Sequence, residues 1–137
     1  MGINLVAVLA ATVAMFAVGA FWYMVPFARA WGEMHGFNKL SKKEQKEMQA
    51  QMGPFYVVQI VVTILAAWAL AYFLTELPHV AWGVTAAMLW LGFIVPTEVS
   101  SIIFGGTENK WMVKKIAISI GGSLLTTFVG AWVITLF

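Results

Sequence analysis

The sequence predicts an all-α integral membrane protein, a four-helix transmembrane bundle in which residues 1–137 form one domain. Charged residues make up 10% of the chain and apolar residues 61%, whereas a typical soluble domain has about 25% charged residues. Four apolar runs are each long enough to cross a hydrocarbon core about 30 Å thick, at about 1.5 Å per helical residue. All eight Lys and Arg residues lie in two of the connections between these runs.

The first span is expected at about residues 3–25. It contains no charged side chain, so it lacks the basic start of a secretory signal peptide and is expected to be retained. It ends in the aromatic cluster Phe21-Trp22-Tyr23, followed by Pro26. Trp and Tyr favour the headgroup level and Pro disfavours continuation of the helix, so both signals place the end of the span here.

The connection after the first span is long and basic. Its second half predicts a short cytoplasmic helix at about residues 41–52, because Ser41 and Glu44 have the spacing of a capping box. Gly53-Pro54 is expected to break or bend the chain before the next span. The charged face of the short helix is interpreted as solvated, with a regulatory lipid-binding segment as the alternative.

The second and third spans are expected at about residues 55–75 and 80–104. The connection between them is only a few residues long, which predicts an antiparallel hairpin. Gln59 and Thr63 are the strongly polar positions inside the second span, and their spacing of four places them on one helix face.

The fourth span is expected at about residues 113–137. Gly122, Thr126 and Gly130 recur in it at every fourth position. Small residues at this spacing let helix backbones approach closely in lipid. The pattern indicates helix packing and does not distinguish packing within the bundle from packing between subunits.

Two features concern the whole bundle. The segments FAVGAFWYMVP and LWLGFIVPTEV each contain a Gly and a Pro at the same end of an odd-numbered span, so two parallel hairpin repeats are one alternative for its architecture. The positive-inside rule places both basic connections in the cytoplasm and both termini outside. We therefore expect a multi-pass protein of the cell inner (plasma) membrane, with the lipid bilayer as its first partner.

Glu98 is the most informative single residue. It lies two residues after Pro96 and eighteen residues after Val80, which is about 27 Å along a helix. A carboxylate inside a span is a functional hypothesis by default, and Pro96 frees a backbone carbonyl that could join a polar site. The alternative is an interfacial carboxylate that is hydrogen-bonded or paired with a loop lysine.

Further polar groups follow the first and third spans, at the same membrane level as Glu98. They could gather with it into a polar vestibule that binds a cation, relays protons or holds a lipid headgroup. The alternative is interfacial anchoring by Trp and Arg side chains. The residues concerned are Arg29, Trp31, Glu33, His35, Glu108, Asn109 and Trp111.

Several kinds of chemistry are disfavoured. The chain has no Cys, and His35 and His79 are expected at opposite membrane surfaces, so they cannot ligate the same metal or haem within one subunit. The sequence contains no nucleophile–base pair and no phosphate-binding glycine loop. It also lacks a basic face with interleaved aromatic residues of the kind that binds nucleic acid. We therefore expect no catalytic residue, no metal, no cofactor and no nucleic-acid partner.

The arrangement of small and aromatic residues resembles a known family. Its elements are the Ala-rich first span with Gly19, Trp22-Tyr23, Phe27, Trp31 and Gly36, then Met52-Gly53 to Tyr56, Ala71-Tyr72, Gly92 and the loop after Phe104. This pattern resembles the DUF1761 family of small bacterial membrane proteins, and the resemblance covers nearly the whole chain. It implies a four-helix integral membrane fold and no assigned chemistry.

Two functional hypotheses remain. The first is a homo-oligomeric channel or transporter-like protein with a polar site at the cytoplasmic interface, where Glu98 lines a pathway together with Gln59 and Thr63. Oligomerisation is part of this hypothesis, because four spans with few polar groups can hardly enclose an aqueous path. The second is a non-catalytic accessory or assembly subunit of a larger membrane complex. A membrane-embedded enzyme is the least favoured reading.

Overall fold

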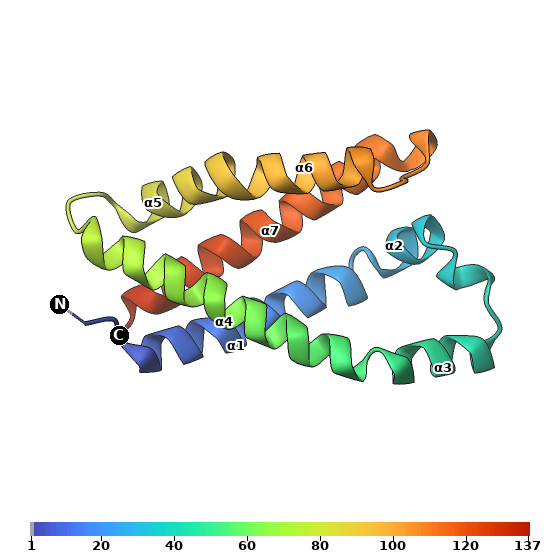
Figure 1. Ribbon diagram of the computed structural model, residues 1–137, viewed down its shortest axis with the longest axis horizontal. Helices are drawn as coiled ribbons and strands as arrows, with labels where there is room; N and C mark the ends of the chain where they lie inside the picture. Colours follow the sequence, from blue (N-terminus) through green and yellow to red (C-terminus); the bar gives the residue numbers. More distant parts are fainter. Residues whose placement is uncertain (1) are drawn as a thin grey trace.

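The computed structural model describes residues 2–137, and the regular elements in this part of the chain are helices joined by short connections (Figure 1). In chain order the elements are α1 (Leu5–Met24), α2 (Ala28–Met34), the 3₁₀ turn η1 (Phe37–Lys39), α3 (Lys42–Gln51), α4 (Gly53–Glu76), α5 (Trp82–Leu89), the π-helical segment η2 (Trp90–Ile94), α6 (Val95–Phe104), the 3₁₀ turn η3 (Asn109–Trp111) and α7 (Met112–Thr135).

Four of these helical stretches are long and apolar enough to cross a membrane. They are Leu5–Met24, Gly53–Glu76, Trp82–Phe104 and Asn109–Thr135, of which the third combines α5, η2 and α6. Large apolar side chains on them point outward, as expected where lipid is the solvent; the side chain of Phe93, for example, is 71% exposed. The predicted all-α, four-span membrane fold is confirmed. The side of the membrane on which each terminus lies stays a prediction.

The two ends of the bundle differ in charge. Figure 1 shows both termini and the α4–α5 connection at one end, and α2, α3 and the α6–α7 connection at the other. All Lys and Arg residues belong to this second end. We call it the basic end.

Local sequence signals account for the boundaries of the helices. The side chain of Asn4 caps α1 by accepting hydrogen bonds from the backbone N–H groups of Val6 and Ala7 at 3.0 and 3.2 Å. The predicted capping box at the start of α3 is confirmed: Ser41 N–H donates to Glu44 Oε2 at 2.9 Å, and Glu44 N–H donates to Ser41 Oγ at 3.2 Å. These contacts pair backbone N–H groups that have no partner inside their own helix.

Helix α7 is the centre of the bundle. It packs against α1 over the most extensive helix–helix contact in the structure, and also against α4, α5 and α6. The buried core beside it is built of small and aliphatic side chains, among them Ala11, Ala67, Ala86 and Ala131. Small residues allow close helix contact, and in a bilayer close packing takes over much of the role that hydrophobic burial has in water.

The small residues singled out on α7 lie on the face that contacts α1. Gly122 lies against the indole ring of Trp22, where a methyl group would approach ring atoms to 2.9 Å. A methyl group at Gly130 would approach Met15 Sδ to 2.5 Å, and the Thr126 methyl group lies beside Gly19. In the structure these positions therefore serve packing within one chain.

Candidate functional site

The third spanning helix is interrupted near its middle by a π-helical turn. Pro96 has no N–H group to donate to Gly92, four residues earlier, and its ring would clash with that carbonyl in a regular α-helix. The structure avoids the clash in η2, where the N–H of Val95 bonds to the carbonyl oxygen of Trp90, five residues back. Such π insertions occur frequently at functional sites.

The π insertion changes which residues share a helix face. In a regular α-helix Trp90 and Glu98 would be about 80° apart, because eight steps of about 100° exceed two turns by that angle. Absorbing one extra residue leaves them about 20° apart. Both side chains consequently face α7.

Glu98 and Trp90 meet at a single serine of α7. Ser123 Oγ donates a hydrogen bond to Glu98 Oε2 at 2.7 Å and accepts one from Trp90 Nε1 at 3.0 Å. The carboxyl group is half-buried and receives this one hydrogen bond from residues 2–137. It therefore keeps oxygen lone pairs that can bind a proton or a cation.

In the described part of the chain the Glu98 carboxylate has no lysine partner, although the sequence leaves open an ion pair with a loop lysine. The ion pairs among residues 2–137 are Arg29–Glu33 at 3.1 Å and Lys110–Glu108 at 3.4 Å, and both lie at the basic end. Glu98 is thus hydrogen-bonded and is not paired with a loop lysine. It lies six residues before the end of α6, about 9 Å inside the spanning helix.

Aromatic residues of α1 approach the same part of α7 from the other side. Trp22 Nε1 donates to the carbonyl oxygen of Ile118 at 3.0 Å. The hydroxyl of Tyr23 lies beside Gly122 on this segment of α7. Five polar side chains therefore meet at one segment of α7: two indole donors, a tyrosine hydroxyl, a serine hydroxyl and a carboxylate. We call them the α7 polar cluster (Trp22, Tyr23, Trp90, Glu98 and Ser123).

The polar pair of the second span lies apart from this cluster. Gln59 Nε2 donates to Thr63 Oγ1 at 3.3 Å, and Thr63 Oγ1 donates to the backbone oxygen of Gln59 at 2.6 Å. Thr63 is buried, whereas Gln59 is exposed. Helix α4 packs against α1, α5 and α7, so Gln59 and Thr63 do not meet Glu98 within one chain.

Some of the predicted vestibule residues gather in a second group at the basic end. A pocket of about 200 Å³ opens there between α2 and the α6–α7 connection, and His35, Glu108 and Trp111 line it together with Lys115. Glu33 and Asn109 are exposed and do not line it.

One aromatic side chain connects the two groups. The ring of Trp31 lies 4.7 Å from that of Tyr23 and 4.6 Å from that of His35, between ring centroids. Lys115 nevertheless lies eight residues before Ser123, about 12 Å along α7. The polar groups expected in a single vestibule thus form two sites at different depths.

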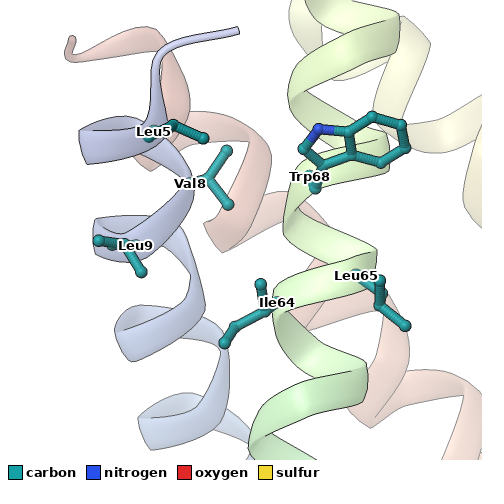
Figure 2. A pocket seen from close by; sticks show the side chains of 6 residues that line it. All are labelled: Leu5, Val8, Leu9, Ile64, Leu65 and Trp68. Atoms are coloured by element: carbon teal, nitrogen blue, oxygen red, sulfur yellow. The ribbon is translucent and has the colours of Figure 1, made fainter.

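A third concave feature is apolar. A groove of about 490 Å³ lies between α1 and α4 near the termini. It is lined by Leu5, Val8 and Leu9 of α1 and by Ile64, Leu65 and Trp68 of α4, and Figure 2 shows Val8 and Ile64 in the space between the two helices. It offers almost no polar atom to orient a ligand, so it does not compete with the polar sites as a functional centre.

The sequence pattern does not indicate two members of the α7 polar cluster. Trp90 and Ser123 are not among the candidate residues that it suggests. The available signal is Pro96, since a proline inside a span disrupts the regular helical hydrogen bonds, and the π-helical turn before it is one way in which a helix accommodates that disruption.

The fold and the α7 polar cluster define a small multi-pass helical membrane protein with a carboxylate inside a spanning helix. A family model described as protein of unknown function (DUF1761) matches residues 6–135, and the chain belongs to the DUF1761 family. The resemblance seen in the sequence is thereby confirmed. No curated protein and no solved structure matches the chain.

Proposed function

We propose that the protein is a small channel or transporter-like protein of the cell inner membrane that conducts protons or monovalent cations as a homo-oligomer. The observation that carries the proposal is the hydrogen bond from Ser123 to Glu98 beside the π-helical turn. An intramembrane carboxylate without a basic partner is expensive to maintain in lipid, and such residues commonly mark ion or proton pathways.

The location of Glu98 supports an oligomeric pathway. Its helix, Trp82–Phe104, is the least covered of the four spans: 6% of an apolar 18-residue stretch is buried, against 22–33% in the other three. One chain offers Glu98 only the α7 side of a path. A second copy packed over α6 would supply the opposite wall and exclude lipid from the carboxylate.

Flux into proteoliposomes tests the proposal. Proton flux is followed with an enclosed pH-sensitive dye, and potassium or sodium flux with ion-selective dyes, under an imposed gradient. Glu98→Gln keeps the shape of the side chain and removes its charge, and we expect it to lower the flux at least about tenfold, the effect of roughly 1.4 kcal/mol on the barrier.

Glu76→Gln is the matched control, because Glu76 is an exposed carboxylate at the opposite end of the bundle. It should leave the flux unchanged. Wild-type flux that persists in Glu98→Gln removes Glu98 from the mechanism. A wild-type protein that is monomeric after gentle solubilisation and inactive in every assay contradicts the proposal as a whole.

The uncovered third span equally suits the second candidate function, an accessory or assembly subunit of a larger membrane complex. In that case α6 packs against a different protein, and the Glu98 carboxylate forms a polar contact that makes the association specific. Cross-linking from an exposed position of α6, such as Thr97, distinguishes the two: a self-adduct supports the homo-oligomer, and a defined heteromeric adduct supports the accessory subunit.

A further inference from the structure

The pocket at the basic end is separate from Glu98 and plays no part in the proposed ion pathway. Its walls come from three separate segments: the end of α2, the α6–α7 connection and the first turn of α7. A volume of about 200 Å³ corresponds to several water molecules at roughly 30 Å³ each. It is therefore large enough for a phosphate group.

His35 and Lys115 face each other in this pocket with defined hydrogen-bonding roles. His35 Nδ1 lies 2.8 Å from the carbonyl oxygen of Trp31 and must donate to it, because a carbonyl only accepts. His35 Nε2, at 3.2 Å from Lys115 Nζ, then accepts from the ammonium group. The ammonium group has three donors, and two remain for a ligand.

The charge balance around the pocket favours an anion. Among residues 2–137, Lys115 forms no ion pair with a carboxylate, and its Nζ lies 5.6 Å from the centre of the Trp31 ring. Glu108 also lines the pocket, but Lys110 compensates its charge at 3.4 Å. Lys114 adds a further positive charge next to the site, 5.6 Å from the centre of the Trp111 ring.

The α6–α7 connection adds a second, independent indication of a ligand. Thr107 lines the pocket, and its buried hydroxyl has no hydrogen-bond partner in the described chain. A buried hydroxyl without a partner carries a free-energy penalty, which an acceptor bound in the pocket would relieve after a small movement of the connection. Gly106, with φ +78°, lets the chain turn around the pocket without a side chain in the way.

We propose that this pocket binds the phosphate group of an anionic lipid headgroup, with Lys115 as the main donor. Trp31 and Trp111 flank the site at the end of the spanning helices, where indole rings favour the headgroup level. A lipid phosphate is held at this level by its acyl chains, whereas a free phosphate ion must be drawn from solution. Basic pockets between spanning helices are known to suit anionic headgroups. The proposal is independent of ion transport.

Native mass spectrometry of the detergent-solubilised full chain tests it, with phosphatidylglycerol as the probe and phosphatidylcholine as the zwitterionic reference. We expect one phosphatidylglycerol per chain to bind in preference to phosphatidylcholine. Lys115→Gln should weaken phosphatidylglycerol binding about tenfold, as expected for loss of one charge-assisted hydrogen bond. Lys115→Arg keeps the charge and should retain binding.

Lys43→Gln is the matched control, because it removes the same charge from the exposed helix α3 at the same end of the bundle. An equal loss of binding in Lys43→Gln and Lys115→Gln would mean that the basic end attracts anionic lipid without a defined site, and it would overturn the proposal. Equal binding of both lipids to the wild type would overturn it as well. Displacement of the lipid by equimolar inorganic phosphate would show a site for the free ion instead.

Discussion

Ser123 donates a hydrogen bond to the carboxylate of Glu98 at 2.7 Å and so joins α7 to α6 inside the spanning region. The same hydroxyl accepts from Trp90 at 3.0 Å. Its removal would leave two polar groups without a partner at a helix–helix contact. The packing of α6 against α7 and the hydrogen bonding of the Glu98 carboxylate therefore both depend on one oxygen atom, Ser123 Oγ.

Ser123→Ala should destabilise the protein by about 1 kcal/mol, the scale measured for hydrogen bonds between membrane helices. Unfolding of the solubilised protein by added SDS measures the effect. Ser100→Ala is the control, because Ser100 is exposed on α6. A double-mutant cycle with Glu98→Ala, which removes the acceptor, should give a coupling energy different from zero, and strict additivity would contradict a direct interaction.

Pro96→Ala should undo the π insertion, because an alanine can donate its N–H to Gly92 and continue a regular α-helix. Trp90 would then rotate away from Glu98 and lose Ser123. In a ¹⁵N-tryptophan NMR spectrum the indole signal of Trp90 should shift while that of Trp22 stays in place. Pro54→Ala provides the comparison, since proline is well accommodated in the first turn of α4.

The fold could be predicted because its main determinants are local. Hydropathy locates the spans, and Ser41 with Glu44 locates the start of α3. The α7 polar cluster could not be predicted in the same way, because a helical wheel places Trp90 and Glu98 on different faces unless the π insertion is known. The pairing of His35 with Lys115 depends on how α2 folds back over the start of α7, and no local signal in the sequence contains that information.

Gly122→Ala should destabilise the bundle by about 1–3 kcal/mol, the usual penalty for overpacking. The added methyl group would approach the Trp22 ring to 2.9 Å and strain the hydrogen bond from that ring to Ile118. Gly83→Ala is the matched control, because its methyl group would meet Phe128 at an ordinary 3.8 Å. It should be neutral or stabilising, since Ala favours helix more than Gly does. Equal effects of the two substitutions would contradict the packing role of Gly122.

Thr85→Val should stabilise the protein by about 1 kcal/mol. The Thr85 side chain is buried at 1% exposure, and its hydroxyl has no hydrogen-bond partner in the described chain, so replacement by a methyl group relieves a desolvation penalty. Thr12→Val removes a buried hydroxyl that donates to the carbonyl oxygen of Val8 at 2.8 Å and should not stabilise. The melting temperatures of the two variants, measured in the same detergent, should move apart. A lower melting temperature for Thr85→Val than for the wild type would show that the hydroxyl has a partner.

The orientation of the bundle can be tested with single introduced cysteines, because the chain contains no Cys of its own that would be labelled. Lys43 lies in α3 at the basic end, and His79 lies in the α4–α5 connection at the opposite end; both are exposed. The positive-inside rule predicts that a membrane-impermeant maleimide added to intact cells labels His79→Cys and spares Lys43→Cys until the membrane is permeabilised. The reverse pattern would place the basic end, with its lipid site, outside the cell. Equal labelling of both variants in intact cells would indicate dual orientation, in which case neighbouring copies in the membrane could pack antiparallel.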